Sequence, residues 1–253
     1  MLGFERREKI ITHIKAAGKV IISELATYFN VSEETIRRDL KKLEKEGMLT
    51  RFHGGASTGE LINNELPYQA RSQHNIAEKK NIATKLMTEI EAGQTLFVDS
   101  SSTVIESMNA LNRENKAGIS IITNSVSLLH DLRDSHINVL STGGELRGKS
   151  NSLVGAITEQ ALQYYYGDMA IFGCKGLNLM AGITESNEAE NQVKRYMSKR
   201  VKKIILLADH TKFDQVAFIK LFNIGDVNCI ITDKAPSKQW QDYLAEKKIR
   251  LIY

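Results

Sequence analysis

Hydroxyl side chains gather directly after a short apolar run of the chain. The run 95–99 reads as a strand that ends in Asp99, and the residues that follow are Ser100, Ser101, Ser102 and Thr103, where a helix begins. Free backbone N–H groups at a helix start favour an anion, and hydroxyls add donors. The pattern predicts an oxyanion site suited to a phosphate. The alternative is that these residues only cap the helix and form its turn.

Polar residues end three other apolar runs in the same way. They are Asn124 after 120–123, Gly143, Gly144 and Arg147 after 138–140, and Lys212 after 204–208. The carboxyl ends of parallel strands meet at the ligand crevice of an open α/β sheet. A diglycine lets the backbone approach a ligand closely, and Lys212 offers a point charge, unless it is simply a surface lysine. Jointly these ends predict a pocket for a small phosphorylated polyol.

A cationic face characterises the expected helix 32–46. At 100° per residue Ile36, Leu40 and Leu43 fall on one side, and the opposite side carries Glu34, Arg37, Arg38, Lys41 and Lys45. A short helix and a turn precede it, which is the helix-turn-helix layout that places its second helix in the major groove of DNA. The alternative is a helical bundle with a charged, solvated face.

The residue types on this helix match what a DNA duplex offers. Arg37 and Arg38 supply forked donors for guanine edges or phosphates. A hairpin over 48–56 reads as a wing. The expected contacts to double-stranded DNA are Ser32, Glu34, Thr35, Arg37, Arg38 and Lys41 from the helix, and Arg51 and His53 from the wing.

The elements that position these residues divide the chain into three parts. Residues 1–57 read as three helices and a hairpin, with Gly18 ending the first helix and Ser23 capping the second. Residues 58–75 are polar and pattern-poor and read as a linker. Residues 76–253 alternate short apolar runs with helical stretches, which favours an α/β fold with parallel strands buried on both faces. The expected strands are 95–99, 120–123, 138–140, 169–173, 204–208, 227–231 and 250–253.

Composition limits the class of protein. The 253 residues are 42% hydrophobic and 25% charged, with two Cys in unrelated contexts and six His without ligand spacing. These values suit a globular, cytoplasmic protein without disulfides, metal or cofactor. No apolar run approaches the roughly 18 residues of a membrane span. Residues 1–56 hold 11 Lys/Arg against 8 Asp/Glu, so most of the net charge of +4 sits there, which weakly favours a polyanion partner.

Two segments of the first 57 residues resemble a known family. V-S-E-E-T-I-R-R-D-L at 31–40 and R-F-H-G-G-A at 51–56 closely resemble the DNA-binding signature of the DeoR family of bacterial transcription regulators. The resemblance implies a winged helix-turn-helix in which Ser32, Thr35, Arg37 and Arg38 contact DNA. Asp39 is expected to order the helix, or to be a charge partner of Lys42 or Lys45 within it.

The resemblance extends over the remaining chain. D-x-x-x-T at 99–103, T-N-S at 123–125, T-G-G-E-L-R at 142–147 and A-D-H-T-K-F at 208–213 look like the DeoR sensor domain, which is similar to ribose-5-phosphate isomerase and CoA-transferase folds. It implies a phosphorylated sugar effector held by residues 99–103, Asn124, the Gly143–Gly144 pair and Lys212. Ser101 stands where the family has glycine, which would narrow that loop. Lys175 is another departure, either a ligand-specific group or a solvent-exposed side chain.

These features support one main hypothesis and two alternatives. The main hypothesis is a homodimeric or homotetrameric repressor of a carbohydrate operon, relieved by a phosphorylated sugar and without catalytic residues. The first alternative is a sugar-phosphate isomerase-like enzyme with a DNA-binding appendage, whose acid–base candidates would be Asp99, Glu185, Glu188, Glu190 and Lys212. The second is a chromatin-type DNA binder without effector.

Overall fold

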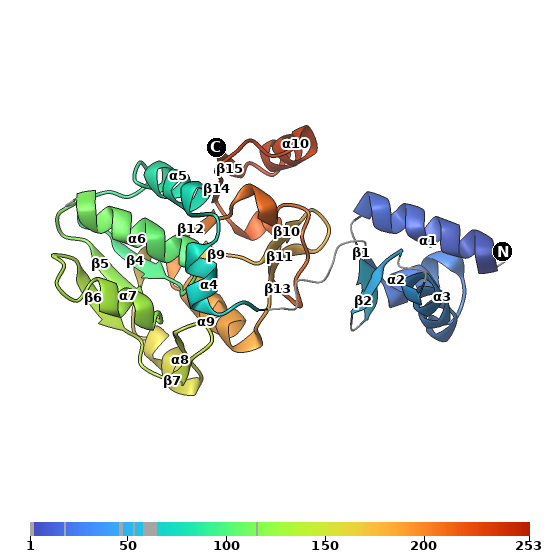
Figure 1. Ribbon diagram of the computed structural model, residues 1–253, viewed down its shortest axis with the longest axis horizontal. Helices are drawn as coiled ribbons and strands as arrows, with labels where there is room; N and C mark the ends of the chain where they lie inside the picture. Colours follow the sequence, from blue (N-terminus) through green and yellow to red (C-terminus); the bar gives the residue numbers. More distant parts are fainter. Residues whose placement is uncertain (1–2, 18, 46–47, 53, 58–64, 115) are drawn as a thin grey trace.

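The chain folds into an amino-terminal domain and a larger α/β domain (Figure 1). The computed structural model describes residues 3–17, 19–45, 48–52, 54–57, 65–114 and 116–253. Two of the sequence predictions, the helix end at Gly18 and the contact residue His53, lie outside the described residues. Within the described residues no helix is long and apolar enough to cross a bilayer.

Three helices and a small antiparallel sheet make up the amino-terminal domain. The helices are α1 (Gly3–Ala17), α2 (Ile22–Phe29) and α3 (Glu33–Lys45), and the strands are β1 (Lys19–Ile21), β2 (Thr50–Phe52) and β3 (Gly55–Ser57), in the order β1-β3-β2. The predicted wing is the β2–β3 hairpin. Strand β1 was not predicted, because three residues are too short to show a period.

The core of this domain confirms the apolar side predicted for α3. Ile36, Leu40 and Leu43 are buried together with Ile10 and Ile14 of α1. The turn between α2 and α3 also forms as predicted, with Asn30 in the left-handed region at φ 52°. The predicted cap of α2 is wrong. Ile21, the last residue of β1, takes the N-cap position, and Ser23 lies in the first turn.

A buried ion pair joins α1 to α3. Asp39 accepts from Arg6 Nε at 2.6 Å and from Arg7 Nη1 at 3.3 Å, and its side chain is only 7% exposed. The arginines of α1, and not Lys42 of the same helix, are the partners found for Asp39, which shares the buried side of α3 with Leu40 and so faces α1. The pair fixes the angle at which α3 is held.

A parallel sheet forms the centre of the larger domain. In the described residues its seven strands run in the order β15-β14-β12-β9-β4-β5-β6, and every neighbouring pair is parallel. The strands are β4 (Thr95–Val98), β5 (Ser120–Thr123), β6 (Asn138–Ser141), β9 (Gly167–Gly173), β12 (Val201–Leu207), β14 (Cys229–Ile231) and β15 (Arg250–Ile252). Each strand expected from an apolar run is present, which confirms the α/β class.

Helices and short strands surround this sheet. The α-helices are α4 (Tyr68–Gln73), α5 (Ile76–Leu86), α6 (Ser102–Glu114), α7 (Val126–Asp131), α8 (Ala156–Leu162), α9 (Glu188–Ser198) and α10 (Lys238–Glu246), with 3-10 turns η1 (His210–Lys212) and η2 (Ile224–Asp226). Strands β10 (Gly176–Asn178), β11 (Gly182–Glu185) and β13 (Ile219–Phe222) form one antiparallel sheet, and β7 (Glu145–Arg147) and β8 (Ser152–Val154) another.

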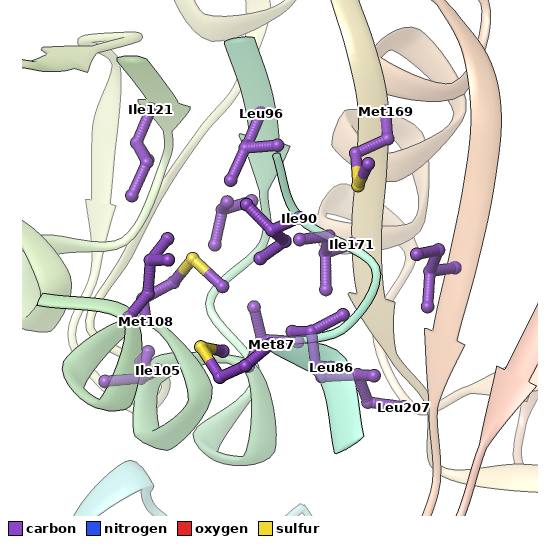
Figure 2. Packing of buried hydrophobic residues seen from close by; sticks show 14 of the residues in the cluster. Leu86, Met87, Ile90, Leu96, Ile105, Met108, Ile121, Met169, Ile171 and Leu207 are labelled. Carbon is purple, nitrogen blue, oxygen red and sulfur yellow. The ribbon is translucent and has the colours of Figure 1, made fainter. Parts of the chain in front are cut away.

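Alternation along the strands produces a hydrophobic core on each face of the sheet. Leu96 and Val98 of β4 pack with α5 and α6 in one cluster, part of which is shown in Figure 2. Phe97, between them, packs with α9 and α10 in the other. Trp240 of α10 is buried in this second cluster. Tyr164 and Tyr166 are 75% and 72% exposed and therefore lie outside both clusters.

The stretch predicted as a linker is partly folded. Helix α4 lies within it, and its first residue, Tyr68, donates its backbone N–H to Lys149 O at 2.8 Å. Ser102 Oγ donates to Arg71 O at 3.3 Å, and Lys79 Nζ also donates to that carbonyl. No pattern indicated this helix, because six residues with no buried side chain carry no periodic signal.

Replacing Asp39 by Ala should destabilise the amino-terminal domain by about 3–5 kcal/mol, because the Arg6 guanidinium would stay buried without its partner. Hydrogen exchange of the α1 and α3 amides in the full chain would measure the effect. Glu34→Ala removes an exposed carboxylate of the same helix and should change exchange by less than about 0.5 kcal/mol. Equal exchange in the two variants would contradict the role given to Asp39.

Candidate functional site

The amino-terminal end of α3 is capped by its own hydroxyls. Ser32 Oγ accepts from the backbone N–H of Thr35 at 3.3 Å and lies 2.9 Å from Thr35 Oγ1. Both side chains remain on the surface. Ser32 therefore sets where the helix starts, and the first turn is presented to solvent with hydroxyl groups that a phosphate backbone can use.

The predicted contact arginines lie on the solvent side of α3, and each has a carboxylate one turn earlier. Arg37 Nη2 is 2.8 Å from Glu33 Oε2, and Arg38 Nε is 3.6 Å from Glu34 Oε1. The Arg38 side chain is 79% exposed. Exposed pairs of this kind contribute little to stability, so DNA can replace the carboxylates. Lys41 is also exposed, one turn further along.

Arg51 connects the wing to α3. Its backbone N–H donates to Glu44 Oε1 at 2.9 Å, and its Nε is 3.9 Å from Glu44 Oε2. The arginine side chain stays about one-third exposed. The β2 strand is thereby held against the end of the helix, and the Arg51 charge remains near the exposed face that α3 presents.

A cavity of about 270 Å³ lies at the carboxyl ends of three adjacent strands, β4, β9 and β12. Residues of α4, α5, α9 and β11 complete its wall. The polar lining comprises Glu65, Arg71, His74, Asn75, Lys79, Asp99, Ser100, Ser101, Ser102, Thr103, Lys175, Glu185, Ser186, Glu190, Lys194, Asp209 and Lys212. The whole predicted 99–103 segment and Lys212 thus meet in one place.

Asp99 orders residues 100–103, which follow β4 and which we call the serine loop. Its Oδ1 accepts from Ser101 N at 3.0 Å, and its Oδ2 accepts from Gly173 N at 3.2 Å and lies 2.8 Å from Lys194 Nζ. Ser101 fits at the position where the family has glycine, because a Cβ on Gly173 would lie only 2.0 Å from Ser101 Oγ. Gly173 on β9 therefore provides the room that Ser101 occupies.

Four cations of the lining influence one another. The pKa of Lys79 is lowered to about 8, chiefly by burial; Asp209 opposes this shift, and the nearby charges of Lys212 and Arg71 add to it. Burial also lowers the pKa of Lys175, again with help from Arg71 and Lys212. Lys175 is therefore a half-buried cavity residue, and the solvent-exposed interpretation was wrong. We call Arg71, Lys79, Lys175 and Lys212 the cation cluster.

A buried lysine neutralises two carboxylates of the cavity lining. Lys194 Nζ contacts Glu185 Oε1 and Asp99 Oδ2 and donates to Gly173 O at 2.9 Å. Burial alone would lower the pKa of Lys194, but Asp99 and Glu185 raise it. Burial raises the pKa of Glu185. Lys194 thus pairs with two carboxylates of the lining, whereas Asp209 is the acid that acts on Lys79 of the cation cluster.

The remaining acid–base candidates differ in their surroundings. Glu188 is exposed at the start of α9, whereas Glu190 is buried and accepts from Ser152 Oγ at 2.8 Å. Burial would raise the pKa of Glu190, but hydrogen bonds from Ser150 and Ser152 outweigh this and lower it. Glu190 is therefore a carboxylate in the cavity wall.

Four of the predicted effector residues do not line the cavity. Asn124 Nδ2 donates to Leu153 O at 3.0 Å, and its buried Oδ1 has no partner among the described residues. Gly143 O accepts from Thr158 Oγ1 at 2.6 Å, and Gly144, at φ +123°, leaves no room for a side chain beside Thr158. These three residues hold β8 and α8 in place. The fourth, Arg147, lies behind the wall.

Arg147 pairs with two acids that do line the cavity. Its Nη1 donates to Glu65 Oε1 at 2.5 Å and to Glu190 Oε1 at 3.4 Å, and its Nη2 donates to Glu65 Oε2. The hydrogen bonds to Glu65 raise the pKa of Arg147. Sequence reasoning missed Arg71, Lys79 and Glu65, because nothing in their local pattern marks a position that only tertiary packing brings to the cavity.

One group of side chains has the composition of a metal site, although the spacing of the histidines in sequence indicated none. The ligand atoms of Glu78, His210 and Asp233 all lie within 4.8 Å of one another. His210 uses both its backbone N–H, at 2.7 Å, and its Nδ1, at 2.8 Å, on the Asp233 carboxylate. This contact fixes the start of η1, which carries Lys212.

Comparisons with known proteins match both domains. Residues 6–60 match the model of the DeoR-like helix-turn-helix domain, and residues 74–234 match that of the DeoR C terminal sensor domain. A solved ribose 5-phosphate isomerase A from Methanocaldococcus jannaschii is similar in fold, with a TM-score of 0.42 and 14% identity over 55% of each chain.

Curated relatives are similar over nearly their whole length. The regulator YulB of Bacillus subtilis is 34% identical over 99% of this chain and 96% of its own. The glycerol-3-phosphate regulon repressor of Escherichia coli K12 is 30% identical over 98% and 97%, and a putative aga operon transcriptional repressor of Escherichia coli O157:H7 is 32% identical over 91% and 86%. The chain therefore belongs to the DeoR family of transcriptional regulators.

Proposed function

We propose that this protein represses an operon for the use of a carbohydrate, and that a small phosphorylated sugar releases it from operator DNA. Two relatives are named as repressors, one of a glycerol-3-phosphate regulon and one of an aga operon. The exposed arginines of α3 are the groups that contact the duplex, and Arg51 contacts the backbone beside them. Lys41, Ser32, Thr35 and Glu34 complete this surface.

The observation that carries the effector assignment is the cation cluster. Four positive groups face a cavity beside a hydroxyl loop, and the two carboxylates nearest Lys194 are already neutralised. A phosphate offers acceptor oxygens and two negative charges, and both relieve the repulsion among Arg71, Lys79, Lys175 and Lys212. A volume of about 270 Å³ suits a ligand smaller than a typical drug molecule.

Repression also requires more than one DNA-binding domain. One helix-turn-helix reads few base pairs, so a homodimer or homotetramer is needed for useful affinity. The effector releases DNA because it binds more tightly to an arrangement of the subunits in which the DNA-binding domains no longer match the operator. A preference of a few kcal/mol is enough to change the occupancy of the operator from mostly bound to mostly free.

Removing either arginine from the outer face of α3 should weaken specific DNA binding. Arg37→Ala and Arg38→Ala should each cost about 1–3 kcal/mol, because each removes a forked donor from the groove. Fluorescence anisotropy with an operator fragment selected from genomic DNA measures this loss. Lys238→Ala, an exposed cation of α10, is the control and should bind as the parent does. Unchanged affinity in both arginine variants would place the DNA contact elsewhere.

Replacing Lys212 by Ala should leave operator affinity intact and weaken the response to a sugar phosphate by about tenfold or more, because a charged hydrogen bond to the ligand is lost. A panel of sugar phosphates titrated against the preformed operator complex measures the response. Lys220→Ala, an exposed lysine of β13, is the control. Turnover of any of these sugar phosphates, abolished in Lys212→Ala, would instead favour the isomerase-like alternative.

Phosphate binding should weaken as the pH rises above about 8. The free cavity holds Lys79 at a pKa of about 8, and a bound anion raises that pKa, so binding above pH 8 must take up a proton. The affinity should be level below that pH and fall by up to about tenfold per pH unit above it. Calorimetry between about pH 7 and 10 in buffers of different ionisation enthalpy measures both effects. Lys79→Met should flatten the profile, and a level profile in the parent would contradict the assignment.

A further inference from the structure

The carboxylate of Glu65, which lines the cavity, already forms an ion pair with Arg147, which lies behind the cavity wall. Both Glu65 oxygens accept from the Arg147 guanidinium, Oε1 from Nη1 at 2.5 Å and Oε2 from Nη2, and the Glu65 side chain is 9% exposed. A two-point contact of this kind is the form in which arginine binds a free carboxylate or phosphate. Glu65 therefore holds Arg147 as an anionic ligand would.

Glu65 differs from the other carboxylates of the cavity in how it is held. Asp99 and Glu185 share Lys194, and Glu190, a residue of α9, accepts a hydrogen bond from Ser152 of β8. Glu65 belongs to no helix or strand, and among the described residues its carboxylate pairs with Arg147. An anion entering the cavity repels every carboxylate of the lining, and Glu65 is held there by an ion pair with Arg147, a cation that does not itself line the cavity.

The position of Glu65 in the chain connects the cavity to the DNA-binding domain. Its neighbours on the carboxyl side are fixed, because Tyr68 N donates to Lys149 O at 2.8 Å and Arg71 Nε donates to Leu66 O at 3.1 Å. On the amino side residues 58–64 lead to β3 of the wing. Arg71, a member of the cation cluster, thus contacts the backbone beside Glu65. A change in the position of Glu65 therefore moves the point at which the connection to the DNA-binding domain begins.

We propose that the Glu65–Arg147 ion pair is an internal competitor of the effector, which the bound anion breaks, so that Arg147 turns to the anion and Glu65 leaves the wall. This inference rests on the proposed function, since it requires an anion in the cavity. It assigns Arg147 to the liganded state and explains why it lies behind the wall here. Release of Glu65 is the step that transmits occupancy toward the wing.

Removing the competing charge should make the cavity bind anions more tightly. If Arg147 is free in about one molecule in ten, Glu65→Gln should bind inorganic phosphate about tenfold more tightly than the parent. Calorimetry with the full chain measures this affinity. Glu145→Gln, an exposed carboxylate two residues from Arg147, makes the same charge change outside the pair and should bind as the parent does.

Hydrogen exchange provides a second readout that a simple change in net charge would not move. Phosphate should accelerate exchange in the peptide covering residues 65–73 of the parent, and in Glu65→Gln that peptide should exchange fast without phosphate. Parent-like affinity and exchange in Glu65→Gln, with phosphate binding that Lys212→Ala abolishes, would overturn the competitor and leave the effector site standing. Absence of phosphate binding in the parent and in Glu65→Gln would overturn both.

Discussion

Four positive groups held around one partly buried cavity are the constraint on which the rest of the sensor domain depends. Burial removes the water that would screen Lys79 and Lys175, and each feels the charges of Arg71 and Lys212. The parallel sheet imposes this arrangement. Strands β4, β9 and β12 are neighbours and end at the same edge, so the serine loop and Lys212 line one cavity together with residues of α4 and α5. On the function proposed above, an anion binds to these four groups.

The domain keeps that positive charge available by neutralising acids elsewhere in the wall. Lys194 binds Asp99 and Glu185. Ser152 of β8 and Ser150, just before that strand, form hydrogen bonds with Glu190. The amino-terminal domain applies the same division of labour. Asp39 is buried against Arg6 and Arg7, whereas Arg37 and Arg38 have only exposed partners that DNA can displace. In both domains the buried ion pairs fix the geometry, and the function proposed above assigns binding to the exposed or mutually repelling charges.

Apolar runs predicted the strands of the parallel sheet because strands buried on both faces need uninterrupted hydrophobic residues. The strands β1, β7 and β10 have three residues each and are too short to carry such a signal. The pairing of β11 with β13 joins segments far apart in the sequence, and neither segment indicates it alone. The serine loop and Lys212 were predicted because each directly follows a strand.

Arg71 and Lys79 escaped prediction because the packing of α4 and α5 places them, and Lys194 because its helix turns a charged residue toward the core. Asn124 and the diglycine are polar strand ends too, but they hold β8 and α8 and do not line the cavity.

The central claim is that occupancy of the cavity by a phosphorylated ligand weakens the grip of α3 on DNA. The most direct measurement is the affinity of the full chain for a labelled operator fragment in the presence of individual sugar phosphates and of the corresponding free sugars. At least one sugar phosphate should lower operator affinity by about tenfold or more, while its free sugar has no effect. Operator affinity that ignores every sugar phosphate, or that responds equally to the free sugar, would contradict it.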